Sequence, residues 1–553
     1  MTILEILHNF YAIEILTTGI LTFISFKAIN IIFYLYNTDQ TLKHIPVNPA
    51  IEVKYFLGLL PFQKTSHIPR ELTADLLYEG AKKLSEKERN GCPLGITKIY
   101  MIPGWPSLIF SHGDVTTILF RTNNVIEKNP MLKTVTEGMF GVGLVTMNAA
   151  DWRQHRRALV KMMHSDLHVD YGTAINKHNK RMIGEFKKMI QKSDEKEKSI
   201  DLLYHDHEFD LTLNVAAEII FGQGLDDEQQ KKEFLKRFNN LVSATEARMF
   251  QPILCQKHLW RLYNWWKGID YTNLVRDYDD MVETLMSTRL DILKKQQSTE
   301  NGKPKNKMPT LMADKLIQLY NEKSITYQEM QAHAKTFFLA ALDTTSNTVI
   351  GAVYSLSHPD NRSVQQKLIE EIDNNFPNMN ELDNFAGIAD NLVDAKMPYL
   401  NGVISEALRI YMPASMIGRQ LVPGVDLKFN ESCKIKINNS ANFRINGLLL
   451  LKQIMSHEIG SDTEKRKFKP ERWTDGELDR KNFSYAPLGR GVRDCIGRPV
   501  AFMMMRLTLL HLYKNFRTEL VIKSEKDKIH YRKMKMNFLY EIDEQPTIRF
   551  FNR

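Results

Sequence analysis

Cysteine is scarce in this chain of 553 residues, which has only 4: Cys92, Cys255, Cys433 and Cys495. No two of them form a CxxC pair. This spacing excludes a disulfide-stapled scaffold and a cysteine-rich zinc module, because both need clustered cysteines. So few thiols in so long a chain are typical of a reducing compartment.

A large excess of charge of one sign is also missing. Lys and Arg total 74 and Asp and Glu total 65, which gives a formal net charge of +9 with the two signs interspersed. Because nucleic-acid binding usually needs a concentrated basic face, we expect no nucleic-acid partner, whereas an acidic protein or a membrane surface fits the sign of the charge. The hydrophobic content of 43% and charged content of 25% exclude a disordered or collagen-like chain. The sequence also has no internal repeat and no GxGxxG dinucleotide motif.

One long apolar run lies near the N-terminus. It extends from Ile15 to Tyr36, a span of 22 residues interrupted by Lys27 and Asn30, and about 20 apolar residues are enough to cross a bilayer. No small-residue cleavage site follows it, which favours a retained anchor over a removed signal peptide. Lys43 and Lys54 follow the run, so the positive-inside rule places the rest of the chain in the cytosol. A buried core helix or an interfacial helix is the alternative.

The chain after this run shows the pattern of one large domain. We expect residues 1–45 to form an anchor and hinge, and residues 46–553 to form a mainly α domain with small β-sheets (α+β). The pattern is largely helical over residues 74–295, with strands at Ile96–Ile102 and Ser107–Phe110. The remaining expectations are a polar loop over Gln296–Pro309, strands for some 30 residues after Arg419, a loop over Ser456–Leu488, a helix over Ile496–Phe516 and strands from there to the end.

The segment around Cys495 has the composition of a metal-binding loop. Gly489 and Gly491 indicate a tight turn before the cysteine, and Gly497 follows it at the start of an apolar helix. Helix-end amides and the neighbouring Arg493 both favour a thiolate. Glycines beside it would let a large planar group lie against the backbone, so the pattern predicts a thiolate that binds a soft metal from one side. A buried structural cysteine is the alternative.

Three further patterns carry chemistry or structure. A capping box at Thr326 opens a long helix with Asp343 and Thr344 in its middle, where a carboxylate beside a hydroxyl offers a proton relay; a polar patch on a buried helix is the alternative. Glu406 and Arg409 share one face of an apolar helix. Trp152 and Arg156 lie one helical turn apart, where an indole N–H and a guanidinium could meet a carboxylate, or where they could belong to an ordinary amphipathic turn.

Together these segments resemble the cytochrome P-450 superfamily, of the membrane-anchored eukaryotic type, whose heme-binding pattern is F-x-x-G-x-R-x-C-x-G. Leu488 stands where the family usually has Phe, and Ala341 where the oxygen-binding helix usually has Gly. The resemblance implies a triangular prism-like fold, with Cys495 as the axial ligand of heme (iron protoporphyrin IX) in a loop that includes Gly491 and Gly497. It further implies propionate contacts for Arg493, Trp152, Arg156 and Arg419, oxygen activation by Thr344, proton delivery by Asp343, and a structural triad of Glu406, Arg409 and Arg472.

The activity that this resemblance implies is a monooxygenase reaction, in which one atom of O2 enters a lipophilic substrate. Electrons would come from an NADPH–cytochrome reductase, a flavoprotein, or a similar donor, at a membrane of the endoplasmic reticulum with the catalytic domain facing the cytosol. A heme-thiolate isomerase or dehydratase on the same fold, and a non-enzymatic heme carrier or sensor, are the alternatives. The substrate stays open among fatty acids, sterols and xenobiotics, with the pocket expected to include Met139–Leu144 and Leu339–Leu342.

Overall fold

The computed structural model describes most of the chain after residue 36. The predicted anchor, Ile15–Tyr36, lies outside the described residues, and none of the helices among those residues combines the length and apolar character needed to cross a bilayer. The described residues are 37–38, 40–47, 53–55, 64–66, 81–93, 95–102, 105–111, 127–128, 130–163, 168–193, 198–225, 227–249, 257–297, 311–383, 385–389, 392, 395–440, 444–450, 459, 461–481, 485–523, 534–536, 540–542 and 545–553.

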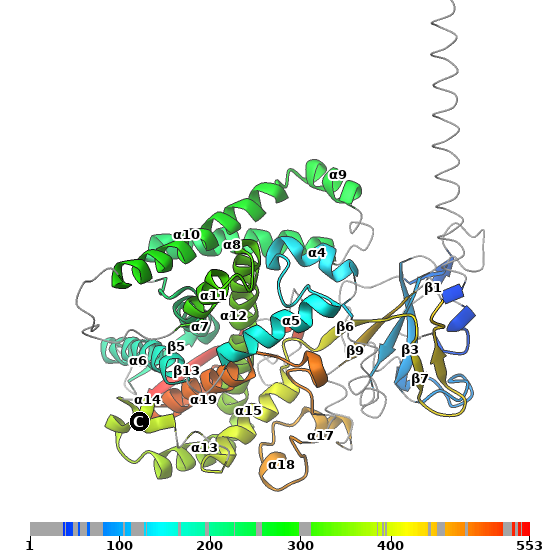
Figure 1. Ribbon diagram of the computed structural model, residues 1–553. Helices are drawn as coiled ribbons and strands as arrows, with labels where there is room; N and C mark the ends of the chain where they lie inside the picture. Colours follow the sequence, from blue (N-terminus) through cyan, green and yellow to red (C-terminus); the bar gives the residue numbers. More distant parts are fainter. Residues whose placement is uncertain are drawn as a thin grey trace, which may run out of the picture.

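Helices dominate the described part of the chain, as expected, and form the larger body in Figure 1. The helices are α4 (Pro130–Phe140), α5 (Ala149–Leu159), α6 (His168–Lys192), α7 (Tyr204–Phe221), α8 (Glu228–Met249), α9 (Lys257–Lys267), α10 (Tyr271–Gln297), α11 (Met312–Asn321), α12 (Tyr327–Ser357), α13 (Arg362–Asn375), α14 (Phe385–Ala389), α15 (Pro398–Ile410), α17 (Asp462–Arg466), α18 (Glu471–Thr474) and α19 (Arg498–Asn515). Short 3₁₀ turns are η2 (Val160–Met163), η5 (Pro359–Asn361), η6 (Met379–Asp383) and η7 (Gly491–Arg493).

The sheets are small, and most of them gather at one side of the helical body (Figure 1). A four-stranded sheet has the order β3-β4-β9-β6, in which only the β4–β9 pair is parallel, and a three-stranded sheet has the order β10-β13-β5. Three antiparallel pairs complete the set, β1–β2, β7–β8 and β11–β12. The strands are β1 (Val53–Tyr55), β2 (Lys64–Ser66), β3 (Ile96–Ile102), β4 (Trp105–Phe110), β5 (Ser199–Leu203), β6 (Met416–Leu421), β7 (Asp426–Lys428), β8 (Lys434–Lys436), β9 (Ile445–Leu450), β10 (Phe516–Leu520), β11 (Met534–Met536), β12 (Tyr540–Ile542) and β13 (Thr547–Asn552).

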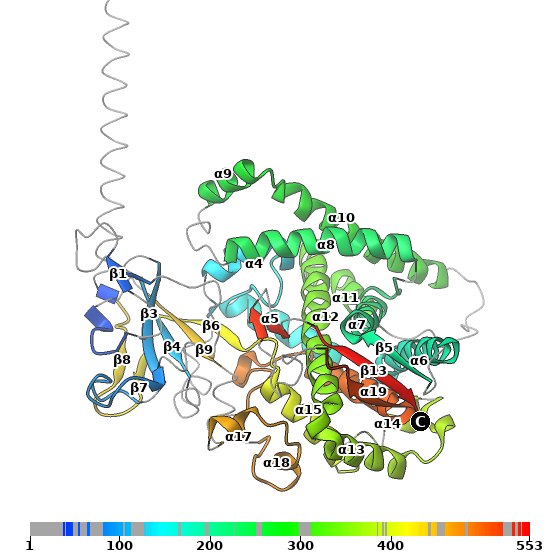
Figure 2. The same ribbon diagram turned by 180° about the vertical axis from the view of Figure 1, so that it is seen from behind.

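Helix α12 runs through the middle of the helical body and positions the site (Figure 2). Its predicted capping box is confirmed: the Thr326 hydroxyl accepts from the Glu329 amide at 3.2 Å, and the Glu329 carboxylate accepts from the Thr326 amide at 2.8 Å. These bonds satisfy backbone donors that the first turn of a helix leaves open. Most of its residues are buried on every side, which is the pattern of a helix at the centre of a core.

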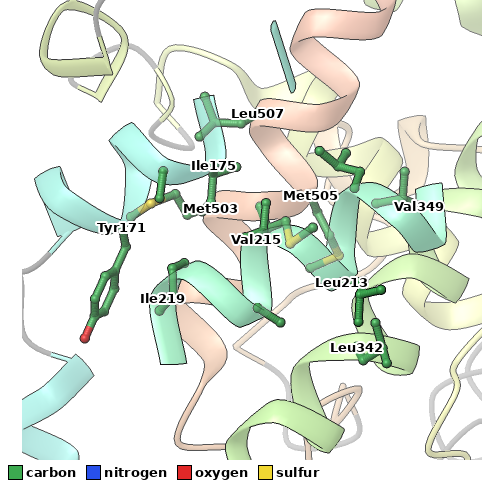
Figure 3. Packing of buried hydrophobic residues seen from close by; sticks show 14 of the residues in the cluster. Tyr171, Ile175, Leu213, Val215, Ile219, Leu342, Val349, Met503, Met505 and Leu507 are labelled. Atoms are coloured by element: carbon green, nitrogen blue, oxygen red, sulfur yellow. The ribbon is translucent and has the colours of Figure 1, made fainter. Parts of the chain in front are cut away.

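The main hydrophobic core lies where α6, α7, α12 and α19 meet (Figure 3). Val215 of α7, Leu342 of α12 and Met505 of α19 are each at most 2% exposed. Flexible Met side chains fill irregular gaps between helices of different direction. A second, smaller cluster forms the core beneath the β3-β4-β9-β6 sheet and the β7–β8 hairpin.

The bounds of several elements agree with the sequence pattern. Strand β3 covers Ile96–Ile102 as predicted, and the long helix expected after Thr326 is α12, which extends to Ser357. The expected loop over Ser456–Leu488 is wrong in part, because it contains the short helices α17 and α18. The Ser461 hydroxyl caps α17 by accepting from the Glu464 amide at 3.2 Å, a signal too local for a periodicity argument to detect. Most of the expected loop over Gln296–Pro309 lies outside the described residues.

Candidate functional site

A cavity opens between α12 and the loop that precedes α19. Its walls include Cys495 from this loop and Thr344 from the middle of α12, so the structure brings together two predicted site residues that lie far apart in the sequence. Trp152, Arg156 and Arg493 line the same space. Gly497 completes the set of predicted residues found on these walls, whereas Asp343, Arg419 and Gly491 do not line it.

The cysteine loop is held by backbone hydrogen bonds. The Cys495 amide donates to the Leu488 carbonyl at 2.8 Å, and Gly489 has a φ of +71° and Gly491 a φ of +74°, values that side chains other than glycine rarely allow. Helix α19 begins at Arg498, two residues after the expected start at Ile496, so Cys495 lies just before a helix N-terminus. The loop thus presents the sulfur from a tightly defined turn.

The electrostatics of Cys495 differ from the sequence-based expectation. Although protein surrounds it, the side chain is exposed because it faces the cavity. Burial raises the pKa of the Cys495 thiol, while a hydrogen bond from the Gly497 amide and the charge of Arg498 lower it only in part. The helix end and the arginines therefore act as predicted, but desolvation outweighs them. A thiolate at this position needs a bound cation to offset the cost of burial.

The middle of α12 is shaped to leave room on the cavity side. Ala340 and Ala341 line the cavity, and the Thr344 hydroxyl donates to the Ala340 carbonyl at 2.6 Å. The preceding residue, Asp343, is half-buried, and its backbone carbonyl accepts a hydrogen bond from the Asn347 side-chain amide at 2.8 Å. Side chains that bond to the preceding turn of a helix compete with its backbone bonds and loosen it locally. The Thr344 hydroxyl can therefore bond either to the Ala340 carbonyl or to a group in the cavity.

Two half-buried cations on the cavity wall, Lys128 and Arg493, lie near the buried Arg419. The side chain of Arg493 donates from Nη1 to the Met147 carbonyl at 3.0 Å, but its buried Nε and Nη2 have no hydrogen-bond partner among the described residues. Burial, together with the charge of Arg419, lowers the pKa of Arg493 to about 9. Burial lowers the pKa of Arg419 to about 10, and it lowers that of Lys128 well below its usual range. Such a cluster is costly unless an anion occupies its centre.

Local structure explains how these cations meet. The Gln420 amide donates to the Glu127 carbonyl at 3.0 Å, which brings Lys128 beside Arg419 on β6. The Asn148 side chain accepts from the Lys128 amide at 2.6 Å just before α5 begins. Lys128 was not predicted, because no pattern in the sequence links an isolated lysine to a strand so far along the chain.

Arg156, for which the resemblance predicts a propionate contact, is bonded to the cysteine loop. Its Nη1 donates to the Asp494 carbonyl at 2.7 Å, and its Nη2 pairs with the Asp494 carboxylate at 2.5 Å. These two hydrogen bonds to one residue fix α5 against the cysteine loop. Asp494 was missed because its role depends on a helix more than 300 positions away in the sequence.

A pair of histidines links α5 to α12. The Nδ1 atom of His155, in the turn between Trp152 and Arg156, lies 2.9 Å from Nε2 of His333. The Nε2 atom of His155 lies 3.3 Å from the Glu329 carboxylate. Burial and the neighbouring His155 lower the pKa of His333 to about 3, so His333 is neutral at physiological pH. Both residues position α5 over the cavity.

The predicted structural triad is brought together in a buried cluster. Glu406 accepts from Arg409 at 2.9 and 2.8 Å, and its carboxylate lies 3.5 Å from Nε of Arg472. The indole N–H of Trp473 donates to the same carboxylate at 2.9 Å. All three charged side chains are at most 2% exposed. One carboxylate therefore joins α15 to the segment around α18.

The residues present fit a heme. Cys495 offers one soft ligand on the cavity wall, and the orphaned guanidinium atoms of Arg493 need a carboxylate such as a propionate. A Cβ on Gly497 would stand 3.9 Å from the Cys495 sulfur, so a side chain there would take up space beside the ligand atom.

Comparison with known proteins agrees with this geometry. The family model described as "Cytochrome P450" matches residues 96–541. Similar curated proteins include "Probable cytochrome P450 4ac1" of Drosophila melanogaster (23% identical, 72% of this chain and 73% of the relative) and "Cytochrome P450 9e2" of Blattella germanica (26% identical, 70% and 73%). "Cytochrome P450 3A6" of Oryctolagus cuniculus is 30% identical over 44% of this chain and 42% of its own length. The chain belongs to the cytochrome P450 family of heme-thiolate monooxygenases.

Proposed function

We propose that this monooxygenase inserts one atom of O2 into a lipophilic substrate, using electrons from a separate NADPH-dependent flavoprotein reductase at a membrane. The observation that carries the proposal is the shared cavity of Cys495 and Thr344. The resemblance described above and the family membership support the same reaction class.

The cavity wall favours an apolar substrate. Its apolar lining includes Leu144, Ile219, Ile220 and Phe337. Burial of an apolar ligand against such side chains is favourable by roughly 25 cal/mol per Å² of apolar surface. The expected pocket over Met139–Leu144 and Leu339–Leu342 is only partly in agreement: Leu144, Ala340 and Ala341 line the cavity, while much of the wall comes from α7.

The side chains of the chain would hold the cofactor and manage protons. Heme, held through Cys495, would supply the electron-transfer and O–O cleavage chemistry that amino-acid side chains lack. Arg493 would bind a propionate, with Trp152 and Lys128 beside it. The Thr344 hydroxyl, which now donates to the Ala340 carbonyl, can turn to hold a proton at Oγ1 toward the cavity, and Asp343 is the proposed source of that proton.

Electron delivery would use the basic outer face of α5. Arg153 and Arg157 are exposed one turn apart, and Lys161 follows in η2. Arg156 on the same helix is bonded to Asp494 beside the heme ligand, so a partner on this face would be close to Cys495. An acidic reductase surface is the complement of this charge, and the association should weaken at high salt.

Membrane association is proposed from two features. The first is the apolar run Ile15–Tyr36, which predicts an anchor in the endoplasmic reticulum membrane with residues 46–553 in the cytosol. The second is α9, which projects at the edge of the helical body (Figure 1). Trp265 is 79% and Trp266 68% exposed there, and Leu262 is 58% exposed. Exposed tryptophans beside basic side chains are typical of a helix at a lipid interface.

The test is turnover of the full chain with an NADPH-dependent flavoprotein reductase and ¹⁸O₂, over fatty acid, sterol and xenobiotic substrates. We expect product that carries one labelled oxygen atom and forms only with NADPH.

Thr344→Ala should keep consuming NADPH while its product per NADPH falls by about tenfold or more. Ser346→Ala is the matched control, because Ser346 also bonds a preceding carbonyl of α12 but does not line the cavity. Product formed without NADPH would instead support an isomerase or dehydratase.

A further inference from the structure

Two cysteine side chains belong to the smaller core, away from the heme cavity. Cys92 precedes β3 and is 3% exposed, and Cys433 precedes β8 and is 0% exposed. The largest influence on the pKa of each thiol comes from the other thiol. The sulfur of Cys92 also lies 3.9 Å from the His44 carbonyl.

The backbone on either side fixes this contact. The Asn430 side chain donates to the Gly91 carbonyl at 2.8 Å and accepts from the Cys433 amide at 2.7 Å. A Cβ placed on Gly91 would stand only 2.7 Å from the Ser432 Cβ, and Gly91 has a φ of +73°. Only a glycine at position 91 therefore lets the turn before β3 lie this close to the β7–β8 hairpin.

We propose that Cys92 and Cys433, packed against each other by this approach, form an oxidative modification site at which hydrogen peroxide closes a reversible disulfide. The disulfide would tie the turn before β3 to the β7–β8 hairpin. Among the residues that the structure describes, no group of three possible His, Cys, Asp or Glu metal ligands is found, so a metal centre does not explain the pair.

The two thiols have different roles in this reaction. The hydrogen bond from Cys433 lowers the pKa of Cys92, and the charge of Lys98 acts in the same direction. The same contact, together with burial, raises the pKa of Cys433. Cys92 is also the less deeply buried of the two, at 3% exposed against 0% for Cys433. Because the thiolate is the nucleophile, Cys92 attacks first and Cys433 resolves.

The chemistry balances with peroxide as the two-electron oxidant. The Cys92 thiolate attacks one oxygen of hydrogen peroxide, the O–O bond breaks, and after protonation one water leaves while Cys92 becomes a sulfenic acid. The Cys433 sulfur then attacks the Cys92 sulfur, the S–O bond breaks and a second water leaves. The two thiols have then lost two electrons and two protons. A sulfur–sulfur bond is about 2.05 Å long, so closure requires a small approach of the hairpin to the turn.

The test treats the heme-loaded full chain with hydrogen peroxide, blocks remaining thiols with N-ethylmaleimide in denaturant, and maps tryptic peptides without reduction. Trypsin places the two cysteines on separate peptides, Asn90–Lys98 and Phe429–Lys434. We expect a linked pair of these peptides, two hydrogen atoms lighter than their sum, to rise from background to the major form. Dithiothreitol should restore the two free peptides.

Two variants separate the roles of the cysteines. In Cys433→Ser, Cys92 should stop at a sulfenic acid that dimedone traps, whereas in Cys92→Ser the Cys433 thiol should stay largely reduced. The heme absorption spectrum reports whether each variant is folded. The proposal is overturned if peroxide that leaves this spectrum intact yields no linked peptide in the unaltered chain, or if the link forms only after unfolding. Equal oxidation of the two single variants would overturn the assigned order of attack.

Discussion

The guanidinium of Arg493 lies over the indole of Trp152, with Cζ 4.0 Å from the ring centroid. The aromatic face supports a cation whose Nε and Nη2 have no partner among the described residues. This arrangement holds the guanidinium in place for a carboxylate that the chain itself does not supply.

Removal of this charge should therefore weaken heme binding in the heme-loaded protein without destabilising the heme-free protein. For Arg493→Gln we expect faster loss of heme, by about tenfold or more, since a buried ion pair loses one partner. The heme-free form should be no less stable than the unaltered one, because the variant removes an uncompensated buried cation. Heme transfer to an acceptor protein measures the first effect and urea unfolding the second. Arg237→Gln, on the exposed face of α8, is the control, and heme loss equal to it would contradict this account.

The buried triad predicts a large and local stability effect. Glu406→Gln leaves Arg409 and Arg472 without their shared anion, and breaking a buried pair typically costs about 3–5 kcal/mol. The urea midpoint and the yield of heme-loaded protein should both fall sharply. Glu464→Gln, which removes an exposed partner of the same Arg472, should change the midpoint far less. A similar loss in both variants would show that burial of the pair is unimportant.

Helix α9 predicts contact with lipid in the full chain. When the protein is reconstituted in vesicles with brominated acyl chains, Trp265 and Trp266 should be quenched because their rings reach the lipid interface. The double variant Trp265→Phe, Trp266→Phe should lose most of the quenching. Trp260→Phe is the matched control on the same helix, since Trp260 is 4% exposed and should contribute little. Quenching that survives the double variant would exclude α9 as the lipid-contacting helix.

A buried carboxyl in α7 predicts that stability falls as pH rises from about 4.5 to about 8. Burial raises the pKa of Glu208 to about 8. Hydrogen bonds that its carboxyl group accepts from Tyr204 at 2.6 Å and Thr212 at 3.4 Å lower the pKa, but burial outweighs them. From its ordinary value of 4.5 up to about 8, the unfolded chain is ionised and the folded chain keeps the proton, so stability falls as pH rises. Glu208→Gln should remove this slope and unfold later than the unaltered chain at pH near 9. Thermal unfolding across pH measures it, and identical pH profiles would contradict the raised pKa.

The sequence predicted well those features that depend on local pattern. The capping box at Thr326, the strand β3 and the glycine-rich turn before Cys495 are each determined by residues within a few positions of one another. Periodicity and turn chemistry detect such features because the same short segment carries both signal and structure.

The rest of the site depends on contacts between distant segments. Lys128 and Asp494 acquire their roles only when β6 and α5 pack against them, and no local pattern marks either residue. The sequence predicts a lowered pKa for the Cys495 thiol, whereas in the structure this pKa is raised. The neighbouring charges can be recognised in the sequence, but the burial that outweighs them depends on the fold.

Iron K-edge X-ray absorption of the purified full chain tests the central claim, that Cys495 holds the heme iron, most directly. We predict a sulfur atom at bonding distance from iron in the unaltered chain and in Cys433→Ser, and no such sulfur in Cys495→Ser. A sulfur ligand that persists in Cys495→Ser, or that is absent from the unaltered chain, would contradict the assignment of the site.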